Sequence, residues 1–218
     1  MSKERLYLFD TTLRDGAQTT GVDFSVEDKR RIAAVLDELG VDYVEGGFPG
    51  ANATDTQFLG EPSQLTSAKL TAFGMTKRSG RSVSNDPGLQ AVLGSRADAI
   101  CLVTKSWDYH VRVALGITNE ENLQALEQSV RAIVETGREA MIDCEHFFDG
   151  YKGNRTTRFL SCVRLTRPGR AGSCCATRTA ARCRTRSSAS SARWQSSCPA
   201  RIWASTPTTT PRMPSPTR

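Results

Sequence analysis

The feature that most constrains the fold is a regular alternation of short apolar segments with amphipathic helical segments. The apolar, strand-type segments are 6–9, 43–45, 70–75, 99–103 and 141–144. Helix-type segments separate them at 25–39, 54–60, 86–93 and 118–134. Short strands that are apolar at successive positions are typical of a parallel sheet buried on both faces. The sequence therefore predicts an α/β fold in which a helix follows each strand.

Two of these helices carry clear end signals. Ser25 is placed to cap the first helix, and Gly40 follows its last turn. Thr118 and Glu121 have the spacing of a capping box at the start of the last helix. The apolar face of the first helix is expected to be Ile32, Val35, Leu36 and Leu39. That of the last helix is expected to be Leu123, Leu126, Val130, Ile133 and Val134.

Polar residues gather directly after the strand-type segments. They are Arg14, Asp15, Glu45, Thr76, Lys77, Lys105, Glu145 and His146. In a (β/α)8 barrel the carboxyl ends of all strands share one rim, and that rim carries the chemistry. A doubly wound open sheet is the alternative, but the first turn lacks its Gly-rich phosphate loop. Five strands do not close a barrel, so we expect about the first five β/α units of a TIM barrel.

The composition changes abruptly near residue 154. Residues 1–154 contain 16 Lys and Arg against 23 Asp and Glu, a net charge of −7. Residues 155–218 contain 13 Arg and no Lys, Asp or Glu, a net charge of +13. The same tail holds five of the seven cysteines and six of the nine prolines. We therefore expect residues 1–154 to be the N-terminal part of a barrel domain and residues 155–218 to be an aberrant, disordered segment.

The run Asp10–Gly16 places an arginine and a carboxylate, Arg14 and Asp15, at the end of the first strand. Such a pair can hold a divalent metal and polarise a carbonyl bound to it. The alternative is a short polar turn in which Arg14 pairs with Asp15 on the surface. The spacing alone leaves both interpretations open.

Five segments together resemble the metal-dependent acyl-CoA condensing enzymes that include the 2-isopropylmalate, homocitrate and citramalate synthases. They are residues 10–16, 45–50, 72–78, 105–112 and 145–150. The runs Ala72–Arg78 and Lys105–Arg112 are most similar to the citramalate synthase branch. The resemblance covers residues 4–154 almost without gaps, and its motifs are specific as a set.

This resemblance implies a (β/α) barrel that joins acetyl-CoA to a small 2-oxo acid, which would be pyruvate for citramalate in isoleucine synthesis. It assigns Asp15 as a metal ligand. It assigns Arg14 to binding the substrate and stabilising the oxyanion that forms on its keto oxygen. Glu145 would orient the substrate or relay protons. The metal would be Mg, Mn or Zn, and a homodimer is implied.

Two motifs of that family are absent from the chain as written. One is a His-x-His pair that completes the metal site, and the other is a Cys-Asp-Thr-Asn-Gly-Gly turn before it. The chain contains only His110 and His146, and neither lies in such a pair. His110 is expected on a surface after the fourth strand, without a metal role, because single histidines rarely ligate.

The Arg-rich tail has three interpretations. It could bind nucleic acid electrostatically, or Cys174, Cys175 and Cys183 could bind zinc, although no C-x-x-C spacing is present. The third is translation in a shifted reading frame, with the slip near Asn154 and residues 159–164 briefly back in frame.

The shifted frame can be tested by choosing codons for the tail. With suitable synonymous codons, a frame that begins one base before Ser173 reads Val-Val-Leu-Cys-Asp-Thr-Asn-Gly-Gly. The same shift before Ser205 reads Ile-His-Thr-His-Asn-Asp. Both absent motifs emerge in the order that the family has, and Met213 and Trp203 leave no codon choice. We therefore prefer the third interpretation and expect no nucleic-acid partner, an inactive chain as written, and strands one and five as open sheet edges.

The remaining signals favour a cytoplasmic protein. The chain shows no basic start followed by an apolar stretch, and its apolar runs are only strand-sized. Cys101 and Cys144 lie in strand-type segments and are expected to be buried, reduced thiols.

Overall fold

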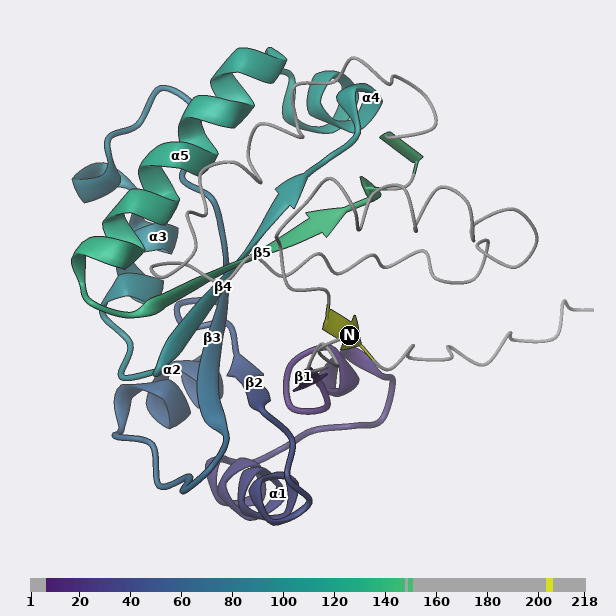
Figure 1. The fold of residues 1–218 in the computed structure, drawn as a ribbon, viewed down its shortest axis with the longest axis vertical. Coiled ribbons are helices and arrows are strands. Elements are labelled where there is room, and N and C mark those ends of the chain that lie inside the picture. Colours follow the sequence, from purple (N-terminus) through teal and green to yellow (C-terminus); the bar gives the residue numbers. More distant parts are fainter. Residues whose placement is uncertain (1–6, 148, 151–202, 206–218) are drawn as a thin grey trace, which may run out of the picture.

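The computed structural model describes residues 7–147, 149–150 and 203–205. Its parallel sheet has the order β5-β4-β3-β2-β1-β6. The strands are β1 (Tyr7–Asp10), β2 (Tyr43–Gly47), β3 (Lys69–Met75), β4 (Ala99–Lys105), β5 (Glu139–Glu145) and β6 (Trp203–Ser205). Strands β1 to β5 follow one another in space as in sequence, and the sheet curls into part of a barrel (Figure 1). The predicted TIM-barrel type with five β/α units is confirmed.

Helices cover one face of this sheet. The longer ones are α1 (Val26–Glu38), α2 (Ala53–Gly60), α3 (Pro87–Leu93) and α5 (Asn119–Glu135). Shorter helical turns are η1 (Gly16–Gln18), η2 (Val83–Asn85), α4 (Asp108–His110) and η3 (Val111–Leu115). Figure 1 shows α1, α2, α3 and α5 along the outer, convex side, as expected when each strand is followed by a crossover helix.

The capping signals act as predicted. The Ser25 hydroxyl accepts a hydrogen bond from the backbone N–H of Asp28, whose carboxylate accepts one from the N–H of Ser25 in return. Thr118 and Glu121 form the same reciprocal pair at the start of α5. Each box satisfies two backbone donors that a helix start leaves without partners.

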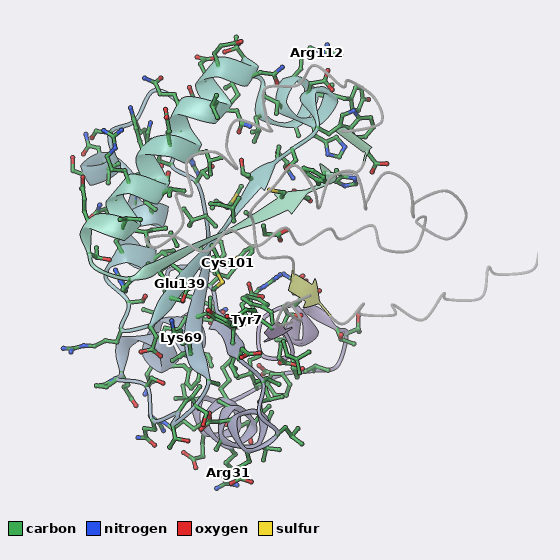
Figure 2. The ribbon with its side chains drawn as sticks, viewed as in Figure 1. Tyr7, Arg31, Lys69, Cys101, Arg112 and Glu139 are labelled. Carbon is green, nitrogen blue, oxygen red and sulfur yellow. The ribbon has the colours of Figure 1, made fainter. Side chains whose placement is uncertain are left out.

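The sheet separates two apolar clusters. The outer cluster, between sheet and helices, contains the fully buried Leu13, Val44, Leu102 and Ile133. The inner cluster, on the concave face, contains Phe9, Tyr43, Ala99, Cys101 and Met141. Figure 2 shows Cys101 near the middle of the sheet, and Arg31 and Arg112 at opposite outer ends of the molecule. Cys101 and Cys144 are both buried, as expected.

A polar group lies at the amino-terminal end of the concave face. The Tyr43 hydroxyl donates to both carboxylate oxygens of Glu139, at 2.9 and 3.0 Å. The Lys69 ammonium donates to the same carboxylate at 2.6 Å. The carboxyl-terminal end of the strands carries the candidate site.

Three expectations are wrong. Val35 and Leu39 are 54% and 72% exposed, because α1 packs against β2 and α2 while no other described helix covers its far side. β1 is not an edge strand, because β6 pairs with it in parallel, Tyr7 opposite Trp203. The tail therefore supplies a three-residue strand, although it was expected to supply none.

β5 does form an edge within the described part of the sheet, as predicted. The other expectations for residues 155–218 lie outside the described residues. In the described part of the chain, every helix is too short or too polar to cross a bilayer.

Candidate active site

The turn after β1 is wound tightly around one carbonyl group. The backbone N–H groups of Arg14, Asp15 and Gly16 all donate to the Thr11 carbonyl oxygen, at 3.2, 2.8 and 3.1 Å. The Asp10 carboxylate accepts from the N–H and the hydroxyl of Thr12 at 2.9 and 3.0 Å. These bonds fix the turn at the carboxyl end of β1, where the rim of a barrel lies.

Arg14 is buried at the centre of the site, with 8% of its surface exposed. Its Nε donates to Glu45 Oε2 at 2.8 Å, and its Nη1 donates to Asp15 Oδ1 at 2.9 Å. The guanidinium carbon lies 4.1 Å from the centroid of the Phe73 ring, a cation–π distance. The interpretation of Arg14 as part of a surface turn is therefore wrong, because its charge is held inside the curled sheet.

Glu45 is a strongly perturbed carboxyl group of this site. Burial raises the pKa of Glu45 to about 7 against the opposing charge and hydrogen bond of Arg14. The negative charges of Asp143 and Asp15 raise it further. A carboxyl group that titrates near neutral pH beside an arginine is a frequent mark of a functional site.

Glu145 lies at the other side of the rim, at the end of β5. It forms an ion pair with Lys105, which stands opposite it in the β4–β5 register. Asn122 of α5 donates to the Lys105 carbonyl oxygen at 3.0 Å and ties the helix to this strand end.

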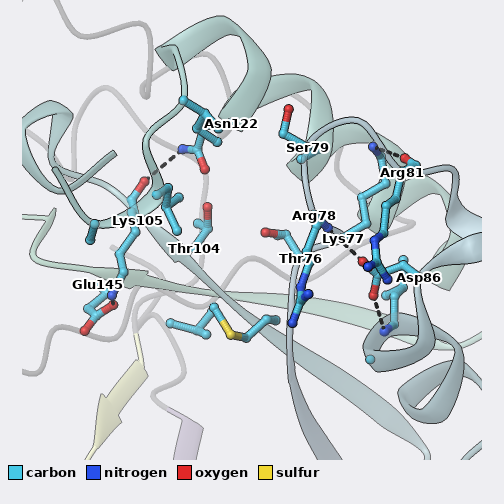
Figure 3. Close-up of a pocket in the computed structure, with 18 of the residues that line it drawn as sticks. Thr76, Lys77, Arg78, Ser79, Arg81, Asp86, Thr104, Lys105, Asn122 and Glu145 are labelled. Atoms are coloured by element: carbon cyan, nitrogen blue, oxygen red, sulfur yellow. Dashed lines mark hydrogen bonds and ion pairs between the residues drawn. The ribbon is translucent and has the colours of Figure 1, made fainter. Parts of the chain in front are cut away.

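A cavity of about 610 Å³ opens beside this pair. Its apolar wall includes Phe48, Met75, Leu89, Val103 and Ile117. Its polar wall includes Lys77, Arg78, Arg81, Lys105, Asp86 and Glu145. Figure 3 shows Thr76 and Thr104 between the Lys105–Glu145 side and the Arg78–Asp86 side. Thr104 also lines the cavity, and within the described part of the chain its buried hydroxyl oxygen has no hydrogen-bond partner.

Two comparisons with known sequences agree with this architecture. A family model described as HMGL-like matches residues 5–155. The chain belongs to the HMGL-like family. The (R)-citramalate synthases of Aquifex aeolicus and Streptomyces coelicolor are each 46% identical to it, over 153 and 154 residues. Each match covers 69% of this chain and 29% of the relative, so the chain spans under a third of their length.

More distant relatives share the fold and part of the sequence. A 2-isopropylmalate synthase of Sulfolobus acidocaldarius is 33% identical over 138 residues, 63% of this chain and 34% of the relative. The crystal structure of a Bacillus subtilis HMG-CoA lyase has a TM-score of 0.60 at 15% identity. It covers 80% of this chain and 59% of the lyase chain, and at that identity it supports the fold alone.

The described residues of this HMGL-like chain do not complete a metal site. They contain no group of three or more His, Cys, Asp and Glu residues that could hold an ion. Asp15 offers a carboxylate with 24% of its side chain exposed, a suitable donor for Mg, Mn or Zn. It is one donor where such ions take four or more. We therefore derive no chemical step through a metal from these residues.

The two histidines lie together, which the sequence did not indicate. The His110 and His146 ring centroids are 4.4 Å apart, and the Trp107 ring lies 4.8 Å from that of His110, tilted by 43°. His146 Nδ1 lies 3.0 Å from Asp149 Oδ2, and its φ is 58°. His110 itself lies in the helical turn α4 after β4 and is partly exposed, consistent with the surface position expected for it.

The structure joins Arg14 directly to Asp15 and places Glu145 on the cavity wall, so all three predicted residues lie at the carboxyl end of the sheet. Sequence reasoning assigned no role to Glu45, Phe73 or Asp143. The sequence did contain a signal for Glu45, which ends an apolar strand and precedes two glycines. Burying a carboxylate there costs free energy unless it is paired, so a glutamate at such a position suggests a specific partner.

Proposed function

We propose that the intact protein transfers the acetyl group of acetyl-CoA to pyruvate and forms (R)-citramalate, an entry to isoleucine synthesis. The observation that carries this proposal is the 46% identity to two (R)-citramalate synthases across the whole strand-and-helix region. The 33% identity to 2-isopropylmalate synthase makes that activity, or homocitrate synthesis, the second choice. The buried Arg14–Glu45 pair, with Asp15 bonded to it, and a cavity at the carboxyl ends of β3 to β5 support an enzyme of this kind.

The reaction joins the methyl carbon of acetyl-CoA to the keto carbon of pyruvate. The methyl group loses a proton to a base, the keto oxygen gains one, and water then releases CoA from the thioester. Arg14 is the substrate-binding and catalytic residue of the proposal. Its guanidinium, fixed by Glu45 and Phe73, stabilises the negative charge that develops on the keto oxygen.

Glu145 is the second catalytic residue of the proposal. Its pairing with Lys105 keeps its carboxylate at the rim, where it orients the 2-oxo acid or relays a proton. We assign no base for the methyl proton.

The cavity suits the long arm of an acyl-CoA. Its apolar wall can pack against the pantetheine chain, and four of its side chains, Lys77, Arg78, Arg81 and Lys105, carry positive charge that attracts phosphate. These features support acetyl-CoA as the co-substrate.

Asp15 is proposed as one ligand of a divalent cation, Mg, Mn or Zn. That ion would make the keto group of the substrate more electrophilic. The other ligands would be the His-x-His pair that the shifted frame encodes within residues 205–218.

Residues 1–154 form the N-terminal part of the catalytic barrel in this proposal, and residues 155–218 are an out-of-frame product. The end of the family match at residue 155 supports this boundary. The chain as written would then be inactive, because Asp15 lacks its partner imidazoles. We place the intact enzyme in the cytoplasm, as a homodimer.

The decisive experiment is to resequence the gene across codons 150–220 and to assay both forms of the protein. A one-base change should restore the His-x-His frame. The repaired protein should release CoA, detected with a thiol reagent, faster with pyruvate than with 2-oxoisovalerate. Activity of the unrepaired chain, or a preference for 2-oxoisovalerate, would contradict the proposal.

The net charge of +13 on residues 155–218 favours one candidate of a different class, a half-barrel with a nucleic-acid-binding tail. Filter binding of the chain to RNA over a range of salt separates the two. An affinity that is strong and falls steeply with salt would favour the tail as a binding segment.

A further inference from the structure

A buried lysine, Lys29 of α1, lies behind the Arg14–Glu45 pair. Only 2% of its surface is exposed. Its ammonium donates to the carbonyl oxygens of Leu13 and Gly46, both at 2.8 Å, and to the carboxylate of Asp55. An ammonium has three donors, and all three are used.

The two carbonyl groups that Lys29 holds are next to the site residues in the chain. Leu13 immediately precedes Arg14, and Gly46 immediately follows Glu45. One ammonium therefore anchors both the turn after β1, which carries Arg14, and the end of β2, which carries Glu45.

Asp55 of α2 completes this anchor from the other side. Its second oxygen accepts the backbone N–H of Phe48 at 2.8 Å. A Cβ atom at Gly47, whose φ is 153°, would lie 2.4 Å from the Asp55 carboxyl carbon. The Phe48 ring in turn contacts Phe73 edge to face at 5.6 Å, and Phe73 lies under the Arg14 guanidinium.

We propose that Lys29 and Asp55 are positioning residues, which fix the turn after β1 and the end of β2 so that Arg14 Nε meets the Glu45 carboxylate. Overall stability explains this arrangement poorly, because a buried ion pair is often no better than a well-packed apolar pair. The Lys29–Asp55 pair also bonds the backbone next to Arg14 and Glu45. A pair that served only stability would not need contacts at these two positions. The inference depends on this geometry and not on which substrate the enzyme takes.

The test uses the full chain and the double variant Lys29→Met/Asp55→Leu. This variant keeps the net charge and replaces both charged side chains by apolar ones of similar size. The matched control is Arg30→Met/Glu61→Leu. Arg30 and Glu61 also join α1 to the end of α2, through a 2.6 Å ion pair, but they are partly exposed. Far-UV circular dichroism checks that each variant is folded.

The readouts are the exchange of the Arg14 Nε–H proton with water, followed by NMR on 15N-arginine-labelled protein, and the titration midpoint of Glu45. An Arg14→Lys sample assigns the Nε–H signal. In the double variant we expect exchange to be faster by roughly tenfold or more and the Glu45 midpoint to move. The control variant should leave both unchanged.

A folded double variant with unchanged exchange and an unchanged Glu45 midpoint would overturn the proposal. If the double variant does not fold, Asp55→Asn decides, because asparagine keeps the shape and one carbonyl acceptor. We expect Asp55→Asn to fold and to show the same changes in weaker form. An Asp55→Asn chain that unfolds, or that matches the wild type in both readouts, would also overturn it.

Discussion

The raised pKa of Glu45 should make the stability of the fold depend on pH in an unusual direction for a carboxyl group. The pKa of Glu45 rises from 4.5 to about 7 because the side chain is buried, with Arg14 opposing the shift. Between these values the folded protein holds a proton that the unfolded chain has lost. The free energy of unfolding therefore falls as the pH rises through this window.

The magnitude follows from the width of the window. Each pH unit between the two pKa values corresponds to about 1.4 kcal/mol, so the full effect is about 3 kcal/mol. The contribution is intact below pH 4.5 and fully lost above about pH 7. Glu45→Gln removes the titration, keeps the size of the side chain, and retains a carbonyl oxygen for Arg14 Nε.

The assay is urea unfolding of the wild type and Glu45→Gln from about pH 4.5 to about pH 8. Subtracting the two curves removes the contributions of all other carboxylates. We expect the variant to gain about 3 kcal/mol relative to the wild type over this range. If the difference in free energy of unfolding between the variant and the wild type changes by less than about 1 kcal/mol over this range, the raised pKa of Glu45 in the folded protein is refuted.

Three further predictions concern stability and activity. The pKa of Asp37 is lowered to about 2 because its carboxylate accepts the backbone N–H groups of residues 66–68. Asp37→Ala should lower the free energy of unfolding by about 1–2 kcal/mol at neutral pH. The wild type loses this stabilisation as the pH falls through about 2. Urea unfolding should therefore show a smaller difference between variant and wild type in acid. Gly74→Ala should cost about 1–3 kcal/mol, because the new Cβ would lie 2.6 Å from a methyl group of Val92; thermal unfolding measures it, and an unchanged melting temperature would contradict it. In the repaired enzyme, Arg14→Gln should lower kcat by about 100-fold or more; a drop confined to KM would show that Arg14 only binds the substrate.

The elements that the sequence predicted well are those whose signals are local. The capping residues Ser25 and Thr118 begin the helices where the pattern placed them. The predicted strand segments agree with the observed strands to within two residues at each end. A short apolar run between two amphipathic helices fits a buried parallel strand and few other structures. Even the link between Arg14 and Asp15 is local, since the residues are adjacent.

The features that the sequence did not predict depend on contacts across the sheet. Glu45 is 31 residues from Arg14, and its altered pKa exists only because the curled strands bury both. Lys29 has the spacing of an ordinary polar helix position, so nothing in the pattern marks it as a buried anchor. The approach of His110 to His146 depends on how the chain turns after β4 and β5. Val35 looked buried because periodicity gives the face of a helix but not which neighbour covers it.

The hydrogen bond between Tyr43 and Glu139 has a consequence for how the barrel is built. These residues lie on β2 and β5, three strand positions apart in the sheet. In a flat sheet the two backbones would be separated by about 14 Å, at about 4.8 Å per strand. A direct 2.9 Å hydrogen bond between side chains that rise from the concave face is favoured by the curl of the sheet. The bond ties β2 to β5 across the arc and so helps to hold the curvature within this segment.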